Sequence, residues 1–364
     1  MSNTLGQAIK LTVFGESHGP YIGGVIDGLP PGLRIDTDYI AAEMAKRRSV
    51  AALSTPRREA DVPQFISGVR AGFTEGTPLA FLIANSNTRS SDYDKLRGLA
   101  RPGHADYTAH IRYDGYEDAR GGGHFSGRLT AVIVAAGAIL RQALESKGIL
   151  IGSHIADLAG IKDDPLNSEE PAADIRRLNS MDFAVLDENA AAEMQERILK
   201  AREASDSVGG VLETWITGLD AGIGEPLFDS FESELSKAVF SIGGVKGIEF
   251  GSGFEMAHMQ GSEANDEFAM KDGRVITLTN HNGGINGGIT NGMPVVFRTV
   301  IKPTPSIAKA QRTVNYINAE EARIEITGRH DPAIIHRARA VVDAAAALVT
   351  ADLICRQHGS RWLV

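Results

Sequence analysis

Two long stretches of the sequence are apolar on nearly every side of a helix, and they limit how the chain can fold. Residues 128–147 read RLTAVIVAAGAILRQALESK, and a segment near 333–357 contains VVDAAAALVTADLI. A helix without a broad polar face has to be covered all round, so each must lie inside the molecule. Gly148 directly follows the first stretch and is expected to cap that helix.

Strand candidates surround these two helices, at 9–15, 64–70, 79–84, 149–158, 210–218, 247–254 and 293–301. Further helices are expected at 37–48, with Thr37 as the N-cap, at 188–204 and at 229–241. The order lacks the regular strand–helix alternation of a doubly wound fold. We therefore expect an α+β fold with long helices packed between sheets, built as a single domain over residues 1–364.

The charge balance and the cysteine count exclude several classes of protein. The chain has 37 basic and 46 acidic residues, a net charge of −9, which argues against nucleic acid as a general partner. One cysteine, Cys355, excludes an intrachain disulfide and any multi-cysteine metal site. The N-terminus lacks a basic-then-apolar signal and no segment reads as a membrane span, so a cytoplasmic protein is expected.

The stretch GESHG at 15–19 matches Gly-x-Ser-x-Gly, the pattern around the nucleophilic serine of many hydrolases. That chemistry requires a helix to open immediately after the serine. Here PYIGGVIDGLPPG follows at 20–32, and its glycines argue against a continuing helix. A serine hydrolase that uses Ser17 is therefore a disfavoured alternative.

Arginines, histidines and glycines gather at 101–128, in KPTPSI at 302–307 and in GRHDPAIIHRAR at 328–339. Guanidinium groups bind oxyanions in a bidentate manner, glycine lets backbone N–H groups approach them, and histidine can donate a proton near neutral pH. These segments predict a pocket for a phosphate- or carboxylate-bearing ligand. No Gly-Lys-Ser/Thr occurs, and RGGGHFSG is not Gly-x-Gly-x-x-Gly. HDPAIIH is interrupted by Pro332, so no metal site is expected.

Together these stretches resemble the chorismate synthase family. Three segments resemble its signatures: GESHGPYIGGVIDGLPPG at 15–32, GGHFSGRLTAVIVAAGAI at 122–139 and RHDPAIIHRARAVVDAA at 329–345. RPGHADYT at 101–108, NHNGGINGGITNG at 280–292 and KPTPSI at 302–307 match in the same order. The resemblance runs from about residue 5 to about residue 355.

The resemblance implies a fold, a reaction and partners. The fold is a sandwich of long helices between antiparallel sheets, assembled as a homotetramer. The activity is that of a lyase that converts 5-enolpyruvylshikimate 3-phosphate to chorismate, by anti-1,4-elimination of phosphate with reduced FMN, in the last step of the shikimate pathway towards the aromatic amino acids. Some members also reduce their flavin with NADPH. No separate nucleotide domain is evident here, which favours an external reductant.

The resemblance also assigns roles to single residues. His104 would protonate the leaving phosphate, His18 would act at the reduced flavin ring, and Asp331 would assist proton transfer at flavin N5. The substrate would be bound by Arg48, Arg101, Arg128, Arg329 and Ser17. The flavin would be bound by His124, Phe125, Ser126, Gly243, Gly244, Gly284, Lys302, Pro303, Thr304, Pro305, Ser306 and Arg329.

The chain departs from the family at a few positions. Residues 124–130 read HFSGRLT where many members have Arg-Ser-Ser-Ala-Arg-Glu-Thr, so His124 replaces an arginine that contacts flavin. Gly243-Gly244 and Asp343 replace Asn-Ala and a glutamate. These changes keep open a second alternative, a non-catalytic binder of flavin or a phosphometabolite. Retention of His18, His104 and Asp331 counts against it.

Overall fold

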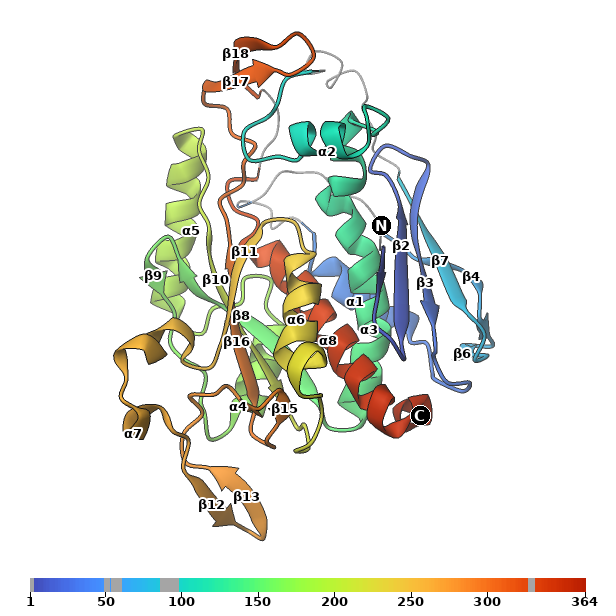
Figure 1. Ribbon diagram of the computed structural model, residues 1–364, viewed down its shortest axis with the longest axis vertical. Coiled ribbons are helices and arrows are strands. Elements are labelled where there is room, and N and C mark those ends of the chain that lie inside the picture. Colours follow the sequence, from blue (N-terminus) through green and yellow to red (C-terminus); the bar gives the residue numbers. More distant parts are fainter. Residues whose placement is uncertain (1–2, 49–52, 54–60, 86–97, 327–330) are drawn as a thin grey trace.

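Two antiparallel five-stranded sheets enclose a layer of helices (Figure 1). The computed structural model describes residues 3–48, 53, 61–85, 98–326 and 331–364. The first sheet has the order β1 (Thr4–Leu5), β2 (Lys10–Gly15), β3 (Tyr21–Asp27), β7 (Leu79–Ala84) and β4 (Gln64–Ser67). The second has the order β11 (Val245–Phe250), β16 (Val295–Ile301), β10 (Gly210–Thr217), β8 (Leu150–Leu158) and β9 (Ile161–Lys162).

The layer between the sheets consists of α1 (Thr37–Ala45), α3 (Thr130–Ser146), α6 (Phe231–Phe240) and α8 (Ile335–His358) (Figure 1). Every residue of α8 from 338 to 355 is buried. Every second side chain of a strand points toward the helices: Leu79, Phe81 and Ile83 of β7 are all buried in the core. The predicted sandwich with long helices between antiparallel sheets is confirmed.

The two long helices cross at very short range because one of them carries a glycine at the crossing. A Cβ atom built on Gly137 of α3 would lie 2.4 Å from Cβ of Ala344 in α8. Charged groups also meet in this layer. Arg141 of α3 donates to Glu43 of α1 at 2.8 Å, and Asp343 of α8 accepts from Ser153 of β8. The aspartate at 343 is thus part of the buried contact between helix and sheet.

Smaller elements surround the sandwich. The helices are α2 (Asp106–Arg112), α4 (Pro171–Asn179), α5 (Glu188–Glu203) and α7 (Gly261–Ala264). The short strand pairs are β5 (Val69–Arg70) with β6 (Phe73–Thr74), β12 (Phe268–Lys271) with β13 (Arg274–Thr277), β14 (Ile285–Asn286) with β15 (Ile289–Thr290), and β17 (Gln311–Asn315) with β18 (Glu320–Ile324). Figure 1 shows α2 and the β17–β18 hairpin at the same end of the molecule.

Several predicted boundaries are corrected. The N-cap of α1 is Asp36, not Thr37, because the Asp36 carboxylate accepts the N–H groups of Asp38 and Tyr39 at 3.1 and 3.0 Å. The strand predicted at 64–70 is divided at Gly68, whose φ is +79°. The strand predicted at 247–254 begins at 245 and ends at 250, and a 3-10 turn (Gly253–His258) follows it.

The end of α3 shows how the chain enters β8. Gly148 follows the C-cap residue Lys147 with φ +84°. Its N–H donates to the Glu145 carbonyl at 3.0 Å, and the next N–H, of Ile149, donates to the Leu144 carbonyl at 3.0 Å. This pair of bonds is a Schellman motif, which glycine favours because the position is left-handed. The predicted use of Gly148 at this helix end is confirmed, one residue beyond the cap.

Among the described residues, one helix is long and apolar enough to cross a membrane by length and composition alone, whereas the sequence pattern predicted none. It spans Gly127–Ser146, and 72% of its most apolar window is buried inside the molecule. The same composition is what a core helix between two sheets requires.

Candidate functional site

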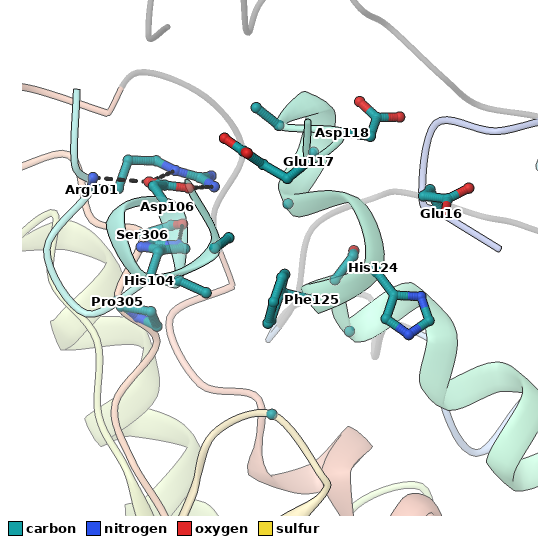
Figure 2. Close-up of a pocket in the computed structure, with 18 of the residues that line it drawn as sticks. Glu16, Arg101, His104, Asp106, Glu117, Asp118, His124, Phe125, Pro305 and Ser306 are labelled. Carbon is teal, nitrogen blue, oxygen red and sulfur yellow. Dashed lines mark hydrogen bonds and ion pairs between the residues drawn. The ribbon is translucent and has the colours of Figure 1, made fainter. Parts of the chain in front are cut away.

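One cavity of about 820 Å³ brings together most of the residues that the sequence assigned to a site (Figure 2). It lies where the end of β2, the segment around α2, the glycine-rich turn before α3 and the 302–306 segment converge. The predicted residues that line it are Arg101, His104, His124, Phe125, Ser126, Gly243, Gly244, Lys302, Pro305 and Ser306. The volume falls in the range of pockets that hold cofactors and drug-sized ligands.

A left-handed glycine turn forms one wall. Gly121, Gly122 and Gly123 have φ values of +59°, +82° and +52°, a run that residues with a Cβ would adopt only under strain. A Cβ built on Gly121 would lie 2.2 Å from Cε1 of His18. The glycine at 121 therefore leaves the space that the His18 ring occupies.

Ser17 and His18 lie in the hairpin turn between β2 and β3, behind that wall. The Ser17 hydroxyl lies 3.0 Å from Nδ1 of His18 and 3.2 Å from the carbonyl oxygens of both Arg120 and Gly121. Because β3 and not a helix follows this turn, the geometry that exposes a nucleophilic serine is missing. Ser17 is buried, its hydroxyl is engaged by the glycine turn and by His18, and it does not line the cavity.

His104 is held at both ring nitrogens. Nδ1 lies 3.1 Å from the Pro102 carbonyl, which can only accept, so Nδ1 carries the hydrogen in the neutral ring. Nε2 lies 2.8 Å from the Ser306 hydroxyl, which then donates to it (Figure 2). Burial, assisted by the charge of Arg101, lowers the pKa of His104 to about 4. The ring is therefore neutral at pH 7 in the absence of a ligand.

Arg101 is fixed beside His104 by Asp106, a residue that the sequence reading did not assign. Nε and Nη2 of Arg101 donate to the two carboxylate oxygens of Asp106 at 2.8 and 2.7 Å, and the Arg101 N–H adds a third bond at 2.9 Å (Figure 2). This pairing lowers the pKa of Asp106 although burial alone would raise it. The position of Asp106, two residues after His104 in RPGHAD, is the sequence signal that could have found it.

His124, which stands where many family members have an arginine, also has its ring held in place by a hydrogen bond. Nδ1 of His124 donates to the Gly15 carbonyl at 2.9 Å, which ties the glycine turn to the end of β2. Phe125 is half exposed in the cavity and meets Tyr113 edge to face, with ring centroids 6.1 Å apart. An aromatic wall of this kind suits a planar ring system.

Among the assigned residues, Lys302 is the second cationic side chain that lines the cavity, after Arg101. Its ammonium group donates to the Gly103 carbonyl at 2.7 Å, and partial burial near Lys246 lowers its pKa. Acidic side chains line the cavity as well, namely Glu16, Asp106, Glu117 and Asp118. None of these carboxylates was predicted, because the sequence patterns that indicate an anion site consist of arginine, histidine, lysine and glycine.

A second group of charged side chains lies behind the wall at Ser126-Gly127. It contains Arg128 and Asp331, which the sequence assigned, and three residues that it did not: Arg47, Asp61 and Arg337. Arg337 donates to Asp331 at 2.5 Å and to the Arg47 carbonyl at 2.8 Å. None of the five lines the cavity as the structure describes it.

The remaining assigned residues are placed as follows. Arg48 is exposed just after α1. Pro303 and Thr304 do not line the cavity, and the Thr304 carbonyl accepts from Ser207 at 2.7 Å. Gly284 lies elsewhere, against the backbone of Pro294. Arg329 lies outside the described residues. No group of three or more His, Cys, Asp or Glu side chains suited to a metal ion occurs within the described ranges.

Comparison with known proteins adds an independent finding. Residues 9–355 match the family model described as chorismate synthase. The chain is 47% identical over 351 residues to chorismate synthase of Methanocella arvoryzae, covering 96% of this chain and 93% of the relative. It is 45% identical over 358 residues to chorismate synthase of Dehalococcoides mccartyi, covering 98% and 97%. A crystal structure titled as chorismate synthase superimposes with a TM-score of 0.77 at 26% identity, covering 97% of this chain and 94% of that one.

Proposed function

The chain belongs to the chorismate synthase family of carbon–oxygen lyases, and on that premise we propose that its cavity converts 5-enolpyruvylshikimate 3-phosphate to chorismate and phosphate. One observation carries the proposal from the structure. Residues from four separate segments, around 101–106, 121–127, 243–244 and 302–306, line a single cavity. They supply the arginine, lysine, histidine and hydroxyl groups that a phosphorylated substrate requires.

The residues present fit a bound flavin mononucleotide. Phe125 and Tyr113 offer aromatic faces, Gly243 and Gly244 allow close approach of the backbone, and Lys302 and Ser306 offer donors for a phosphate. Reduced FMN, when bound, supplies electron density that helps phosphate to leave and recovers it as the C6 hydrogen departs, with no net redox change. Exclusion of water from the cavity by the bound ligands would strengthen the electrostatic interactions on which such an elimination depends.

His104 is proposed to move a proton to an anionic group of the bound ligands. A phosphate dianion next to the ring favours the imidazolium form, so ligand binding raises the pKa of His104 from its low value in the free protein. Ser306 can follow this change because a hydroxyl donates to the neutral ring and accepts from the protonated one. The bond to Ser306 brings His104 to the segment assigned to flavin, so either the substrate phosphate or the flavin is within its reach.

Two other residues keep the roles that the resemblance implies. His18, held behind the glycine turn by Ser17 and by the space at Gly121, is proposed to act as a proton donor near the reduced flavin. Asp331, held by Arg337, is proposed to assist proton transfer at the flavin. A homotetramer, a cytoplasmic location and use of an external reductant instead of NADPH are proposed on the same basis.

An anaerobic assay tests the proposal. The protein is mixed with chemically reduced FMN and 5-enolpyruvylshikimate 3-phosphate, and chorismate absorbance and phosphate release are followed. Equal amounts of chorismate and phosphate, lost with oxidised FMN, are expected. Flavin binding without turnover would instead support the non-catalytic binder, and turnover with NADPH and oxidised FMN would add a reductase activity.

A further inference from the structure

Three guanidinium groups and two carboxylates meet directly behind the cavity wall at Gly127. The cations are Arg47, Arg128 and Arg337, and the carboxylates are Asp61 and Asp331. Nη2 of Arg47 donates to the carbonyl of Gly127, a cavity-lining residue, at 3.4 Å. The cluster is therefore separated from the cavity by little more than one peptide unit.

Asp61 is the carboxylate that binds two of these cations at once. Its Oδ2 accepts from Nη1 of Arg47 at 2.8 Å, and its Oδ1 accepts from Nη1 of Arg128. The side chains of Arg47, Arg128 and Asp61 are 8%, 9% and 11% exposed. One carboxylate thus spans two guanidinium groups in a largely dry environment, as a bound oxyanion would.

Among the five groups named here, the guanidinium groups outnumber the carboxylates. Burial, with the charges of Arg337 and Arg128 adding to it and that of Asp61 opposing it, lowers the pKa of Arg47 to about 10. Two guanidinium groups that share one carboxylate form an arrangement in which an oxyanion can also be bound.

The backbone of Asp61 is consistent with a contact that can be exchanged. Its φ is +47°, in the left-handed region that residues other than glycine occupy at a cost. Aspartate is one of the side chains that tolerate this region best. The two arginines, by contrast, are anchored elsewhere: Arg47 also donates to Thr130 at 3.1 Å, and Arg128 donates to Asn85 at 2.9 Å and to the Ala84 carbonyl at 3.0 Å.

We propose that Asp61 is a built-in substitute for an oxyanion of the substrate, holding Arg47 and Arg128 in place until that oxyanion displaces it. The inference rests on the proposed function, since it takes the phosphorylated substrate as the displacing ligand. It assigns two residues outside the sequence-predicted set: Asp61 as a positioning residue and Arg47 as a partner of Arg128.

The first test measures thermal unfolding of the full chain, without flavin, against inorganic phosphate. The Asp61→Asn substitution removes the carboxylate charge that faces Arg47. The Tm of this variant should therefore be below that of the wild type in a buffer without oxyanions. Phosphate should restore it, and the phosphate Kd should be about tenfold lower than for the wild type, because no carboxylate competes. A parallel titration with acetate separates a site for phosphate from one for a carboxylate: the stronger rescue identifies the displacing group.

The matched control is Asp352→Asn. Asp352 is a buried partner of Arg356, at 2.5 Å, and it lies in the contact between α8 and the N-terminal segment. Its Tm deficit should persist in phosphate. The inference would be overturned if phosphate raised the Tm of the wild type and both variants equally, or if it did not raise the Tm of Asp61→Asn. Asp61 would then be only a structural partner of the two arginines.

A second measurement uses the wild type and does not depend on the folding of a variant. A carbodiimide with an amine nucleophile labels accessible carboxyl groups, and mass spectrometry reads the extent at Asp61. Labelling should increase at least several-fold when sulfate or the substrate is present, because the displaced carboxylate becomes accessible. Unchanged or decreased labelling contradicts the inference. If the wild type forms no chorismate, the proposed function fails, whereas chorismate formation without displacement of Asp61 refutes this inference alone.

Discussion

His104 and Ser306 lie 202 residues apart in the sequence and are joined by a hydrogen bond of 2.8 Å across the cavity wall. The Pro102 carbonyl fixes the hydrogen of the neutral ring on Nδ1, so Nε2 is the nitrogen that gains and loses a proton. The hydroxyl of Ser306 therefore contacts the atom at which proton transfer would occur.

Replacement of His104 by Ala should lower kcat/KM for chorismate formation by about 10²- to 10⁴-fold, the range that general acid–base groups contribute. Ser306→Ala should lower it by about tenfold, because the ring loses a neutral hydrogen bond, and Ser306→Thr should restore most of it. Steady-state rates of the three variants check this. Full activity of Ser306→Ala would show that the bond to His104 has no part in turnover.

The same variant decides which ligand His104 serves. If His104→Ala weakens FMN binding, measured by flavin fluorescence, with little change in the substrate KM, the ring acts at the flavin. A raised substrate KM with unchanged FMN affinity places it at the leaving phosphate. The first outcome would correct the role that the resemblance implies for His104.

Acid should destabilise the fold through the buried side chain of His336. Burial, with the charge of Arg337 adding to it, lowers the pKa of His336 to about 4 from its ordinary value near 6.5. The unfolded chain then binds more protons between these values, so stability falls as the pH is lowered from about 6.5 to about 4. The loss from this one group should approach about 3 kcal/mol. Denaturant unfolding of the wild type and His336→Asn at pH 7 and pH 4.5 measures it; an unchanged pH slope in the variant would refute the assignment.

The glycine turn offers a matched pair of substitutions. Gly121→Ala and Gly122→Ala both place a Cβ at a left-handed position and should each cost about 1–2 kcal/mol of stability. At Gly121 the new Cβ would also lie 2.2 Å from the His18 ring, whereas at Gly122 the nearest atom is Cβ of Ser126, at 4.0 Å. Only Gly121→Ala should therefore reduce kcat strongly. Equal losses of kcat would mean that the conformation of the turn, and not the position of His18, limits turnover.

The crossing of α3 and α8 can be tested without touching the cavity. Gly137→Ala should destabilise the protein by about 2 kcal/mol, since overpacking by one methyl group outweighs the gain in helix propensity. Adding Ala344→Gly should recover part of the loss, because it removes the Cβ atom that lies 2.4 Å from the added methyl. Urea unfolding measures both, with KM expected to stay unchanged. A stabilising Gly137→Ala would show that the helices can move apart at no cost.

The sequence determined the layers of the fold and part of the cavity wall. Helices without a polar face, at 128–147 and near 333–357, cannot be stable on a surface, so their burial follows from the sequence pattern alone. The motif segments and the family resemblance they carry named His104, His124, Lys302 and two of the glycines that line the cavity. The same reasoning missed Asp106, whose importance arises from its contact with Arg101.

Only the tertiary structure decided which of these groups face the cavity and which face one another. Arg101 and Arg128 are alike in the sequence, but the first lines the cavity and the second is held behind its wall by Asp61. That difference depends on distances between segments that are far apart in the chain, and residue type carries no information about them. The same holds for the low pKa of His104, which burial and the charge of Arg101 produce once the chain has folded.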